Sequence, residues 1–411
     1  MGAPAARAVE LSRHWAAAGH EVTVLTGFPN HPTGVVPPEY RAKLRRLVMR
    51  ENVDGVKVVR TWLLPAANRG SYQRMMNYGS FCISSALTGL FIPRPDVVIA
   101  TSPQLLVGLS GWWLARAKRV PFVFEVRDLW PESLIAVGMG RPDSILHRVL
   151  AKLAGFLYAK SDHIVVVTPA FKDHLIRHWC VPPEKISIVE NGVETDLFRP
   201  GPPDEQLRRE LGLEGKFVVS YIGTMGMAHG LETLIESAAG LQQSAPQVMF
   251  LLVGEGAEKD RIIALAKSRV LTNMHFVDQQ VREKIPDYIR LSNACLVLLR
   301  KTELFKTVIP TKMLEFMSCG VAVILVVDGQ ARQVVEEAQA GLFVEPGVPK
   351  VLAEAVIQLA NDAELRQSLG ANGRQYIVQH FSRQQKAELY TAVLAGILES
   401  SAETPGSCYL T

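Results

Sequence analysis

Residues 307–324 read Thr-Val-Ile-Pro-Thr-Lys-Met-Leu-Glu-Phe-Met-Ser-Cys-Gly-Val-Ala-Val-Ile, and their pattern predicts a loop, a short helix, a glycine stop and a strand. The apolar run 294–299 lies just upstream, as expected for a parallel strand that is covered on both faces. Pro310 suits the start of a helix, and Gly320 suits its left-handed end. This strand–helix–strand order indicates a parallel α/β sheet.

The polar residues of this segment gather where the helix begins. A helix that starts just after the carboxyl end of a strand presents unpaired N–H groups and a positive dipole end, which suits a phosphate. Lys312 adds a positive charge in the first turn, and Glu315 lies on the same helix face as Thr311 and Lys312. The segment therefore predicts a phosphate site whose carboxylate accepts hydrogen bonds from sugar hydroxyls. The alternative is a surface ion pair between Lys312 and Glu315 on an ordinary helix.

Length and composition describe a globular protein with two domains. The chain has 411 residues, of which 48% are hydrophobic and 20% are charged. Its five cysteines form no CxxC motif and no paired spacing, so we expect reduced thiols in a cytoplasmic protein. Neither a Cys/His metal pattern nor an Asp-x-Asp triplet is present, so we expect no metal cofactor. No signal peptide is recognisable.

Charge is distributed unevenly along the chain. Residues 1–199 carry 24 Lys and Arg against 16 Asp and Glu, whereas the remainder carries 20 against 24. A basic first half suits an anionic membrane or a phosphorylated acceptor, although ordinary solvated surface explains it as well. The apolar stretch 81–92 is too short to span a bilayer, but residues within 71–92 suit a peripheral membrane helix. A core helix is the alternative for the same residues.

Strand and helix patterns alternate throughout the chain. The expected strands cover residues 21–26, 56–61, 96–100, 122–126, 163–167 and 186–189, then 217–222, 248–253, 274–276, 294–299, 322–327 and 341–344. Helices are expected between them, and 191–215 has the Gly, Pro and charge content of a linker. The pattern predicts two α/β domains. The chain opens on what is normally the loop after a first strand, so we expect a natural start about ten residues earlier, with a truncated chain as the alternative.

Five stretches in this order resemble glycosyltransferase family 4, whose members are retaining enzymes of the GT-B fold. They are 125–133 (Glu-Val-Arg-Asp-Leu-Trp-Pro-Glu-Ser), 189–200 (Val-Glu-Asn-Gly-Val-Glu-Thr-Asp-Leu-Phe-Arg-Pro), 221–226 (Tyr-Ile-Gly-Thr-Met-Gly), 250–256 (Phe-Leu-Leu-Val-Gly-Glu-Gly) and 315–323. The resemblance covers roughly residues 1–398. The first stretch is similar to a subgroup that builds bacterial surface polysaccharides with N-acetylfucosamine or N-acetylglucosamine. Ala322 departs from the family pattern, which has Pro there.

The resemblance implies an α/β protein of GT-B fold, with two Rossmann-like domains facing across a cleft. Residues 1–195 would form the acceptor-binding domain, with its first strand missing, and 196–380 the domain that binds the nucleotide-sugar donor. Residues 381–399 would form a helix that packs back on the first domain, and 400–411 a disordered tail. Domain closure is expected about residues 192–215.

The resemblance also implies an activity. We expect a cytoplasmic hexosyltransferase, peripheral to the inner membrane surface, that needs no metal and no cofactor and binds no nucleic acid. It would transfer an N-acetylated amino sugar from a UDP-sugar to a polyprenyl-linked saccharide in exopolysaccharide or O-antigen biosynthesis. Two alternatives remain: a UDP-sugar 2-epimerase, and an inactive nucleotide-sugar-binding partner of a polysaccharide assembly complex.

The family motifs place the site residues. Donor contacts are expected from Gly223, Thr224, Gly226, His229, Val277, Pro310, Thr311, Lys312 and Glu315, with Gly2 in the phosphate loop of the first domain. Asp128 would orient the acceptor as a catalytic residue, and Arg127 would meet an acceptor phosphate. An internal Arg127–Asp128 pair is the alternative. Arg7 could meet donor or acceptor, and His229 could simply begin the next helix.

The chain departs from the family at three charged positions. Thr307 stands where the family has the first of two glutamates, which puts the group near the anomeric centre in doubt. Thr224 and His229 stand where the family has a phosphate-binding Arg and Lys. Lys312 is therefore expected to supply the charge that neutralises the diphosphate.

Overall fold

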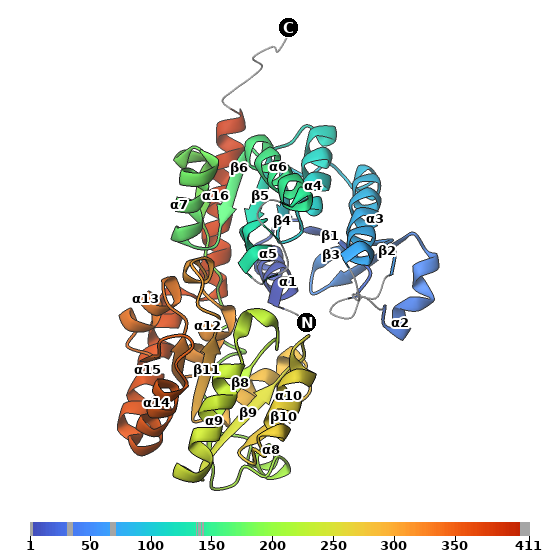
Figure 1. The fold of residues 1–411 in the computed structure, drawn as a ribbon. Coiled ribbons are helices and arrows are strands. Elements are labelled where there is room, and N and C mark those ends of the chain that lie inside the picture. Colours follow the sequence, from blue (N-terminus) through green and yellow to red (C-terminus); the bar gives the residue numbers. More distant parts are fainter. Residues whose placement is uncertain are drawn as a thin grey trace. The chain divides into compact units, whose positions relative to one another are not determined.

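The computed structural model describes residues 3–30, 36–65, 71–136, 138, 141 and 144–402. They divide into two compact units: residues 3–190 with 384–402, here the amino-terminal unit, and residues 191–383, the carboxy-terminal unit. Each is an α/β body (Figure 1). The prediction for Gly2 and most of the expected tail 400–411 lie outside the described residues.

The amino-terminal unit contains two sheets. Its elements are α1 (Ala3–Ala17), β1 (Thr23–Gly27), α2 (Pro38–Arg41), η1 (Lys43–Arg45), β2 (Val48–Val53), β3 (Val56–Thr61), α3 (Ser71–Leu90), β4 (Val98–Thr101), α4 (Leu105–Lys118), β5 (Phe122–Val126), α5 (Glu132–Ala136), α6 (Ile145–Lys160), β6 (His163–Val166), α7 (Pro169–Trp179), η2 (Pro183–Lys185), β7 (Ile186–Ile188) and, from the end of the chain, α16 (Arg383–Ala402). The strands β4-β5-β6-β7 form a parallel sheet, and β1-β3-β2 form a second, mixed sheet. Within the described residues β1 pairs only with β3 and β4 only with β5, so the strands of this unit form two separate sheets.

Strand β2 was not among the strands predicted from the sequence. It runs antiparallel to β3 in a hairpin whose turn is Asp54-Gly55, with both residues at positive φ. The Asn52 side chain accepts a hydrogen bond from the Gly55 amide at 3.0 Å. An Asp-Gly pair between two such runs is a strong hairpin signal, so the sequence did contain the information.

The carboxy-terminal unit is built on one parallel sheet of six strands in the order β10-β9-β8-β11-β12-β13. Its elements are α8 (Glu205–Glu210), β8 (Phe217–Ile222), η3 (Met227–His229), α9 (Glu232–Ser244), β9 (Val248–Val253), α10 (Lys259–Ser268), β10 (Met274–Val277), η4 (Arg282–Lys284), α11 (Ile285–Arg290), β11 (Ala294–Leu298), η5 (Leu304–Thr307), α12 (Thr311–Ser318), β12 (Ala322–Val326), α13 (Gln330–Glu337), β13 (Gly341–Phe343), α14 (Pro349–Asn361) and α15 (Ala363–His380). Every residue of β8, β11 and β12 is buried, which explains their unbroken apolar sequences.

Residues 191–215, expected to be a linker, pack instead as part of the carboxy-terminal unit. Val193, Phe198 and Leu213 are fully buried in its core, and α8 lies within the same stretch. The Val193 amide donates to the Phe381 carbonyl at 2.9 Å. The Gly and Pro content suggested a flexible segment, but the apolar residues between them anchor it.

Helix α16 belongs to the amino-terminal unit although it ends the described chain. Tyr390 packs edge to face on Trp15 with 5.3 Å between ring centroids. Ala387 joins the same cluster with Leu11 and Val123. Among the described helices, none has both the length and the hydropathy needed to cross a membrane.

Candidate functional site

The helix α12 starts as the sequence predicted, at the carboxyl edge of the six-stranded sheet. Pro310 is its N-cap residue, and Thr311 is its first helical residue. Gly320 ends the segment at a left-handed φ of 73° before β12 begins. The local rules for Pro and Gly therefore placed both ends of this helix correctly.

Lys312 points from the first turn of α12 to the loop that follows β8. Its Nζ atom is buried and has no hydrogen-bond partner among the residues that the structure describes, although the residue as a whole is only partly buried. It lies 4.1 Å from the centroid of the Tyr221 ring, and a Cβ on Gly223 would lie 3.4 Å from it. Burial lowers the pKa of Lys312 to about 7, although Glu315 opposes this shift. A buried, unpaired ammonium group is costly without a ligand to pair it.

The loop of residues 223–226 brings bare backbone next to Lys312. Gly223 has a φ of 145°, a conformation that side chains disfavour. A second loop, with Gly254 and Gly256, packs directly against it. If these glycines had side chains, a Cβ at 254 would lie 2.0 Å from the Gly223 carbonyl oxygen, and a Cβ at 256 would lie 2.2 Å from the Met225 carbonyl oxygen. The glycines at 254 and 256 thus let the two loops touch.

His229 and Tyr221 complete this loop, and both act through contacts that the sequence did not reveal. The Gly226 amide donates to Nδ1 of His229 at 3.3 Å. Burial, reinforced by the charge of Lys312, lowers the pKa of His229 to about 3, so the ring is neutral at neutral pH. The Tyr221 hydroxyl donates to the Thr224 carbonyl at 2.6 Å. Tyr221 therefore fixes the loop through its hydroxyl, while its ring makes a cation–π contact with the Lys312 ammonium group.

Glu315 does not pair with Lys312, which corrects the alternative of a surface Lys312–Glu315 ion pair. Its Oε1 accepts from Nη1 of Arg282 at 2.8 Å, and the Arg282 guanidinium stacks over the Phe198 ring at 4.9 Å. The Glu315 residue is buried, so it is no surface residue either. Arg282 could not be predicted as the partner of Glu315 because the two residues lie 33 positions apart in the sequence. Glu315 remains one turn behind Lys312 on a common helix, as expected.

Val277 ends β10, next to the two loops. Its carbonyl accepts a hydrogen bond from the Gly254 amide at 3.0 Å, so it helps to hold the second loop. Thr224 is exposed, and its carbonyl is the acceptor for Tyr221. The backbone contacts that we expect from both residues to a nucleotide stay predictions.

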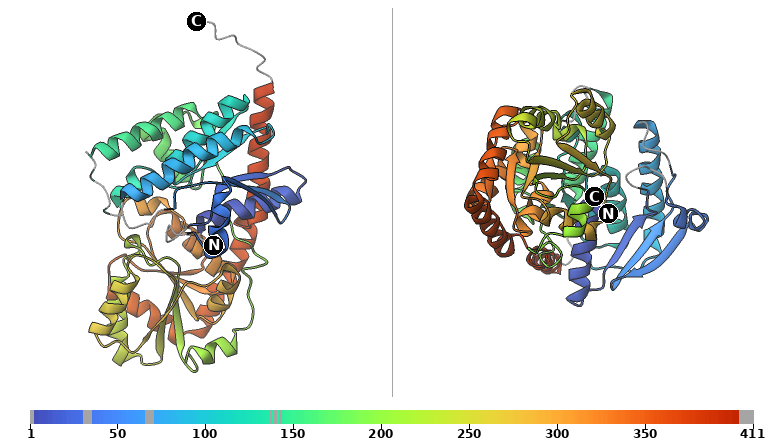
Figure 2. Two further views of the ribbon diagram at one scale, coloured as in Figure 1. Left: turned by 90° about the vertical axis from the view of Figure 1, so that its right-hand side faces the viewer. Right: turned by 90° about the horizontal axis from the view of Figure 1, so that it is seen from below.

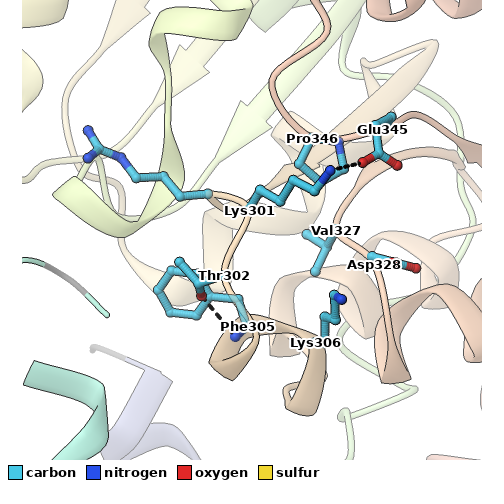
Figure 3. Close-up of a pocket in the computed structure, with 9 residues that line it drawn as sticks. Lys301, Thr302, Phe305, Lys306, Val327, Asp328, Glu345 and Pro346 are labelled. Atoms are coloured by element: carbon cyan, nitrogen blue, oxygen red, sulfur yellow. Dashed lines mark hydrogen bonds and ion pairs between the residues drawn. The ribbon is translucent and has the colours of Figure 1, made fainter. Parts of the chain in front are cut away.

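Thr307 closes the short helix η5 that follows β11. Its hydroxyl donates to the Leu304 carbonyl at 2.6 Å. The preceding residue, Lys306, approaches the loop after β12 so closely that a Cβ on Gly329 would lie 2.1 Å from the Lys306 carbonyl oxygen. Figure 3 shows the small pocket at this contact, where Lys301 points to Glu345, with 2.7 Å between Nζ and Oε1. The loops after β11, β12 and β13 thus support one another where the family glutamate is replaced.

A larger pocket of about 320 Å³ opens at the same edge of the sheet. It lies between the start of α9 and Gly347 and is lined by His229, Arg300 and Lys301, among others. Arg300 is held there by the Glu232 carboxylate at 3.3 Å. His229 contributes to both this pocket and the loop 223–226.

In the amino-terminal unit, Arg127 and Asp128 follow strand β5 as predicted. One hydroxyl, that of Ser102 after β4, accepts from the amides of Arg127 at 2.7 Å and Asp128 at 3.3 Å. Burial raises the pKa of Asp128 to about 6, against the opposing charge of Arg127. Ser102 was not singled out in the sequence, because nothing local indicates that β4 and β5 end side by side. The turn holds a carboxylate that can accept a proton near neutral pH.

Arg7 is a structural residue, which corrects the expectation that it could meet donor or acceptor. It is 1% exposed, and its Nε and Nη2 donate to Oε1 of Glu125 at 3.0 and 2.9 Å. Its Nη1 and Nη2 also donate to the carbonyls of Glu190 at 2.7 Å and Val189 at 2.9 Å. Arg7 therefore ties α1 to β5 and to the end of β7.

Metal ligands do not gather anywhere in the described ranges: no group of three or more His, Cys, Asp or Glu residues there could hold an ion. Cys82, Cys180, Cys295 and Cys319 are unpaired thiols. Metal independence stays a prediction.

Two family descriptions together cover most of the chain. Residues 2–192 match "Glycosyl transferase 4-like domain", and residues 203–376 match "Glycosyl transferases group 1". A relative is described as "Putative colanic acid biosynthesis glycosyl transferase WcaI" of Escherichia coli strain K12. It is 25% identical over 324 residues, which are 76% of each chain.

Solved structures share the fold. Sucrose-phosphate synthase from Thermosynechococcus elongatus matches with a TM-score of 0.77 and 20% identity over 97% of this chain and 94% of that one. Anabaena Alr3699/HepE in complex with UDP-glucose matches with a TM-score of 0.69 and 17% identity over 92% of this chain and 100% of that one. The chain is therefore a glycosyltransferase whose residues 203–376 match the group 1 family, and it has the GT-B fold of two Rossmann-like sheets with helices.

Proposed function

We propose that this glycosyltransferase transfers a sugar from a UDP-sugar to a polyprenyl-linked saccharide, with retention, in the biosynthesis of a surface polysaccharide. The observation that carries the donor assignment is the buried Nζ of Lys312, which has no hydrogen-bond partner and lies against the glycine loop 223–226. A diphosphate at the start of α12 would pair that ammonium group and accept from the helix N–H groups. Glu315, one turn behind, would accept from the ribose hydroxyls.

The UDP moiety is proposed from a structural relative. Alr3699/HepE was solved with UDP and with UDP-glucose, and it shares the fold across the whole of its length. The polysaccharide role is proposed from WcaI, whose description names colanic acid biosynthesis. The N-acetylated amino sugar and the polyprenyl carrier rest on the motif at residues 125–133. The peripheral attachment to the inner membrane surface rests on residues 71–92 and on the basic first half of the chain.

Catalysis by this arrangement would rest on positioning and on stabilising the leaving group. The bond between C1 of the sugar and the diphosphate breaks as negative charge grows on the diphosphate. Fixed N–H dipoles and Lys312 would stabilise that charge without a metal ion. Asp128, whose backbone amide is held by Ser102, would accept a hydrogen bond from the attacking hydroxyl. Arg127 beside it would meet the phosphate of a lipid-linked acceptor.

UDP release from a panel of UDP-sugars, with a bacterial membrane extract as acceptor, tests the proposal. We expect release with one donor only when the extract is present, and loss of release in Lys312→Ala and Glu315→Ala. Lys350→Ala, an exposed lysine of α14, is the matched control and should keep full activity.

Two other outcomes would contradict the proposal. Interconversion of UDP-N-acetylglucosamine without any acceptor would indicate the UDP-sugar 2-epimerase. UDP binding with no release from any donor would indicate the inactive binding partner, the alternative that Thr307 in place of the family glutamate favours.

A further inference from the structure

Arg282 is a charged residue to which the proposed function gives no role. It lies in η4, after strand β10, and its side chain is 13% exposed. Its Nη1 is 2.8 Å from Oε1 of Glu315, whose side chain is 11% exposed. An ion pair this deeply buried constrains both side chains, because neither can turn to water without leaving the charge of the other buried. The pair therefore fixes Glu315 before any nucleotide binds.

The pair connects the two segments that flank the glycine loops of the candidate donor site. Strands β10 and β11 are separated in the sheet by β9 and β8, and the loops 254–256 and 223–226 follow those two inner strands. Figure 2 shows the carboxy-terminal unit, coloured from yellow-green to dark orange, with helices on both faces of this sheet. Arg282 comes after β10, and Glu315 lies in α12, which comes after β11. The ion pair therefore joins the segments on either side of the two loops.

The Phe198 ring gives Arg282 a fixed support. The guanidinium lies over this ring at 4.9 Å, and Phe198 is fully buried in the core of the unit. The Phe198 carbonyl accepts hydrogen bonds from the Ser318 hydroxyl at 2.5 Å and from Nη1 of Arg374 at 3.0 Å. Because Ser318 and Glu315 both belong to α12, the support of Arg282 and its ionic partner are anchored to the same helix. This arrangement leaves the Glu315 side chain little freedom to turn.

We infer that Arg282 is a positioning residue, which holds the Glu315 carboxylate in place for the ribose hydroxyls of the donor and makes the site specific for ribonucleotides. The inference rests on the proposed function, which assigns Glu315 to these hydroxyls. A carboxylate has two oxygens with about four acceptor positions, so its bond to Arg282 is compatible with further bonds to a diol. A carboxylate that is already ordered loses little side-chain entropy when the nucleotide binds.

The fixed carboxylate also explains why a nucleotide without ribose hydroxyls should bind poorly. A site built to accept hydrogen bonds from hydroxyl groups rejects an analogue that lacks them, because the ligand then displaces water from a buried polar group without replacing its hydrogen bonds. A mobile glutamate would avoid this penalty by turning to solvent. Arg282 prevents that movement, so discrimination between the two ligands depends on both residues.

A purely structural ion pair is the alternative role for Arg282. In that role the pair would stabilise the packing of η4 against α12, and its loss would weaken the binding of every nucleotide by the same factor. A positioning role changes the ratio of two affinities instead, because only one of the two ligands has the hydroxyls. The ratio of the dissociation constants of 2′,3′-dideoxy-UDP and UDP therefore separates the two roles.

Calorimetric titration of the full chain with these two nucleotides tests the inference. The wild type should bind UDP at least about tenfold more tightly than 2′,3′-dideoxy-UDP. In Arg282→Met the ratio should fall to about threefold or less, mainly because UDP binds more weakly. Glu315→Ala should lower the ratio at least as far. Adding Arg282→Met to that variant should change the ratio no further, since the two residues act as one unit.

Arg290→Met is the matched control. Arg290 forms a partly buried ion pair with Asp287 in α11 of the same unit, and its loss should leave the ratio at the wild-type value. Arg282→Lys keeps the charge but not the planar fork of the guanidinium, so its ratio should lie between those of the wild type and Arg282→Met. If Arg282→Met does not fold, the lysine variant decides alone: a lowered ratio supports the inference, and the wild-type ratio overturns it.

Three results would overturn the inference, and they bear differently on the proposed function. The wild-type ratio in folded Arg282→Met would leave the proposed donor site intact, because Glu315 would then bind the ribose without help. A wild type that binds UDP and 2′,3′-dideoxy-UDP equally would also remove Glu315 from the ribose. A wild type that binds neither nucleotide would overturn the proposed UDP donor as well.

Discussion

Two buried cations in this protein have opposite surroundings. Arg7 in the amino-terminal unit directs its donors to one carboxylate and two carbonyls, all within 3.0 Å. Lys312 in the carboxy-terminal unit has a buried Nζ with an aromatic ring and a glycine loop beside it, but no hydrogen-bond partner in the described part of the chain. A cation that is fully paired stabilises the fold, whereas one left unpaired indicates where a ligand binds. Three predictions test this contrast, and a fourth tests the role of the Asp128 carboxylate.

The largest effect is expected from Arg7→Met. Removing the guanidinium leaves Glu125 buried without its main partner, so the free energy of unfolding should fall by about 3–5 kcal/mol. Urea unfolding measures it. Arg261→Met, which removes two ion pairs made by a half-exposed arginine, is the control and should cost less than about 1 kcal/mol. A loss as small as the control's would mean that Arg7 has no structural role.

Next comes the pH dependence of UDP binding. In the free protein the pKa of Lys312 is lowered to about 7, and pairing with a diphosphate should raise it. Above pH 7 binding must then take up a proton, so the Kd for UDP should rise by up to about tenfold per pH unit. Calorimetry in two buffers of different ionisation enthalpy measures the proton uptake directly. A Kd that stays constant from pH 7 to 9 would contradict the account.

Asp128 should determine how the activity falls on the acidic side of its pH profile. Its pKa is raised to about 6 by burial, so the carboxylate that accepts from the attacking hydroxyl is lost below that pH. Sugar-transfer rates should fall by up to about tenfold per pH unit below 6. In Asp128→Asn the rate should be low and lack this limb. An unchanged profile in the variant would remove Asp128 from the mechanism.

The smallest effect is expected on the stability of Lys312→Met. No hydrogen bond is lost and a buried charge disappears, so the free energy of unfolding at pH 7 should change by less than about 1 kcal/mol or increase. Lys312 loses its proton near pH 10 in the unfolded chain but near pH 7 in the folded chain. The free energy of unfolding of the wild type should therefore rise relative to that of the variant as the pH rises from 7 to 10. Thermal unfolding across this range measures it. A large destabilisation would mean that Lys312 is as structural as Arg7.

Sequence reasoning succeeded where the information is local. Pro310 and Gly320 define α12, and the unbroken apolar runs of β8, β11 and β12 predict buried parallel strands. The position of Lys312 beside the glycine loop also followed, because both lie at the carboxyl ends of neighbouring strands.

Long-range pairing is what the sequence could not supply. The pairs Glu315–Arg282 and Arg7–Glu125 join residues 33 and 118 positions apart, and only the folded chain brings them together. The same holds for Ser102, which anchors the turn at Asp128 from another strand. The segment 191–215 was misjudged because Gly and Pro content says nothing of the buried Val193 and Phe198.

The central claim is that Lys312 binds the diphosphate of a nucleotide sugar. Titrating the wild type and Lys312→Met with UDP at pH 7, in samples of matched thermal stability, tests it most directly. The account predicts that the variant binds UDP at least about tenfold more weakly, which is the loss of one charge-assisted hydrogen bond of about 1.5 kcal/mol or more. Equal affinities in two equally stable proteins would contradict it.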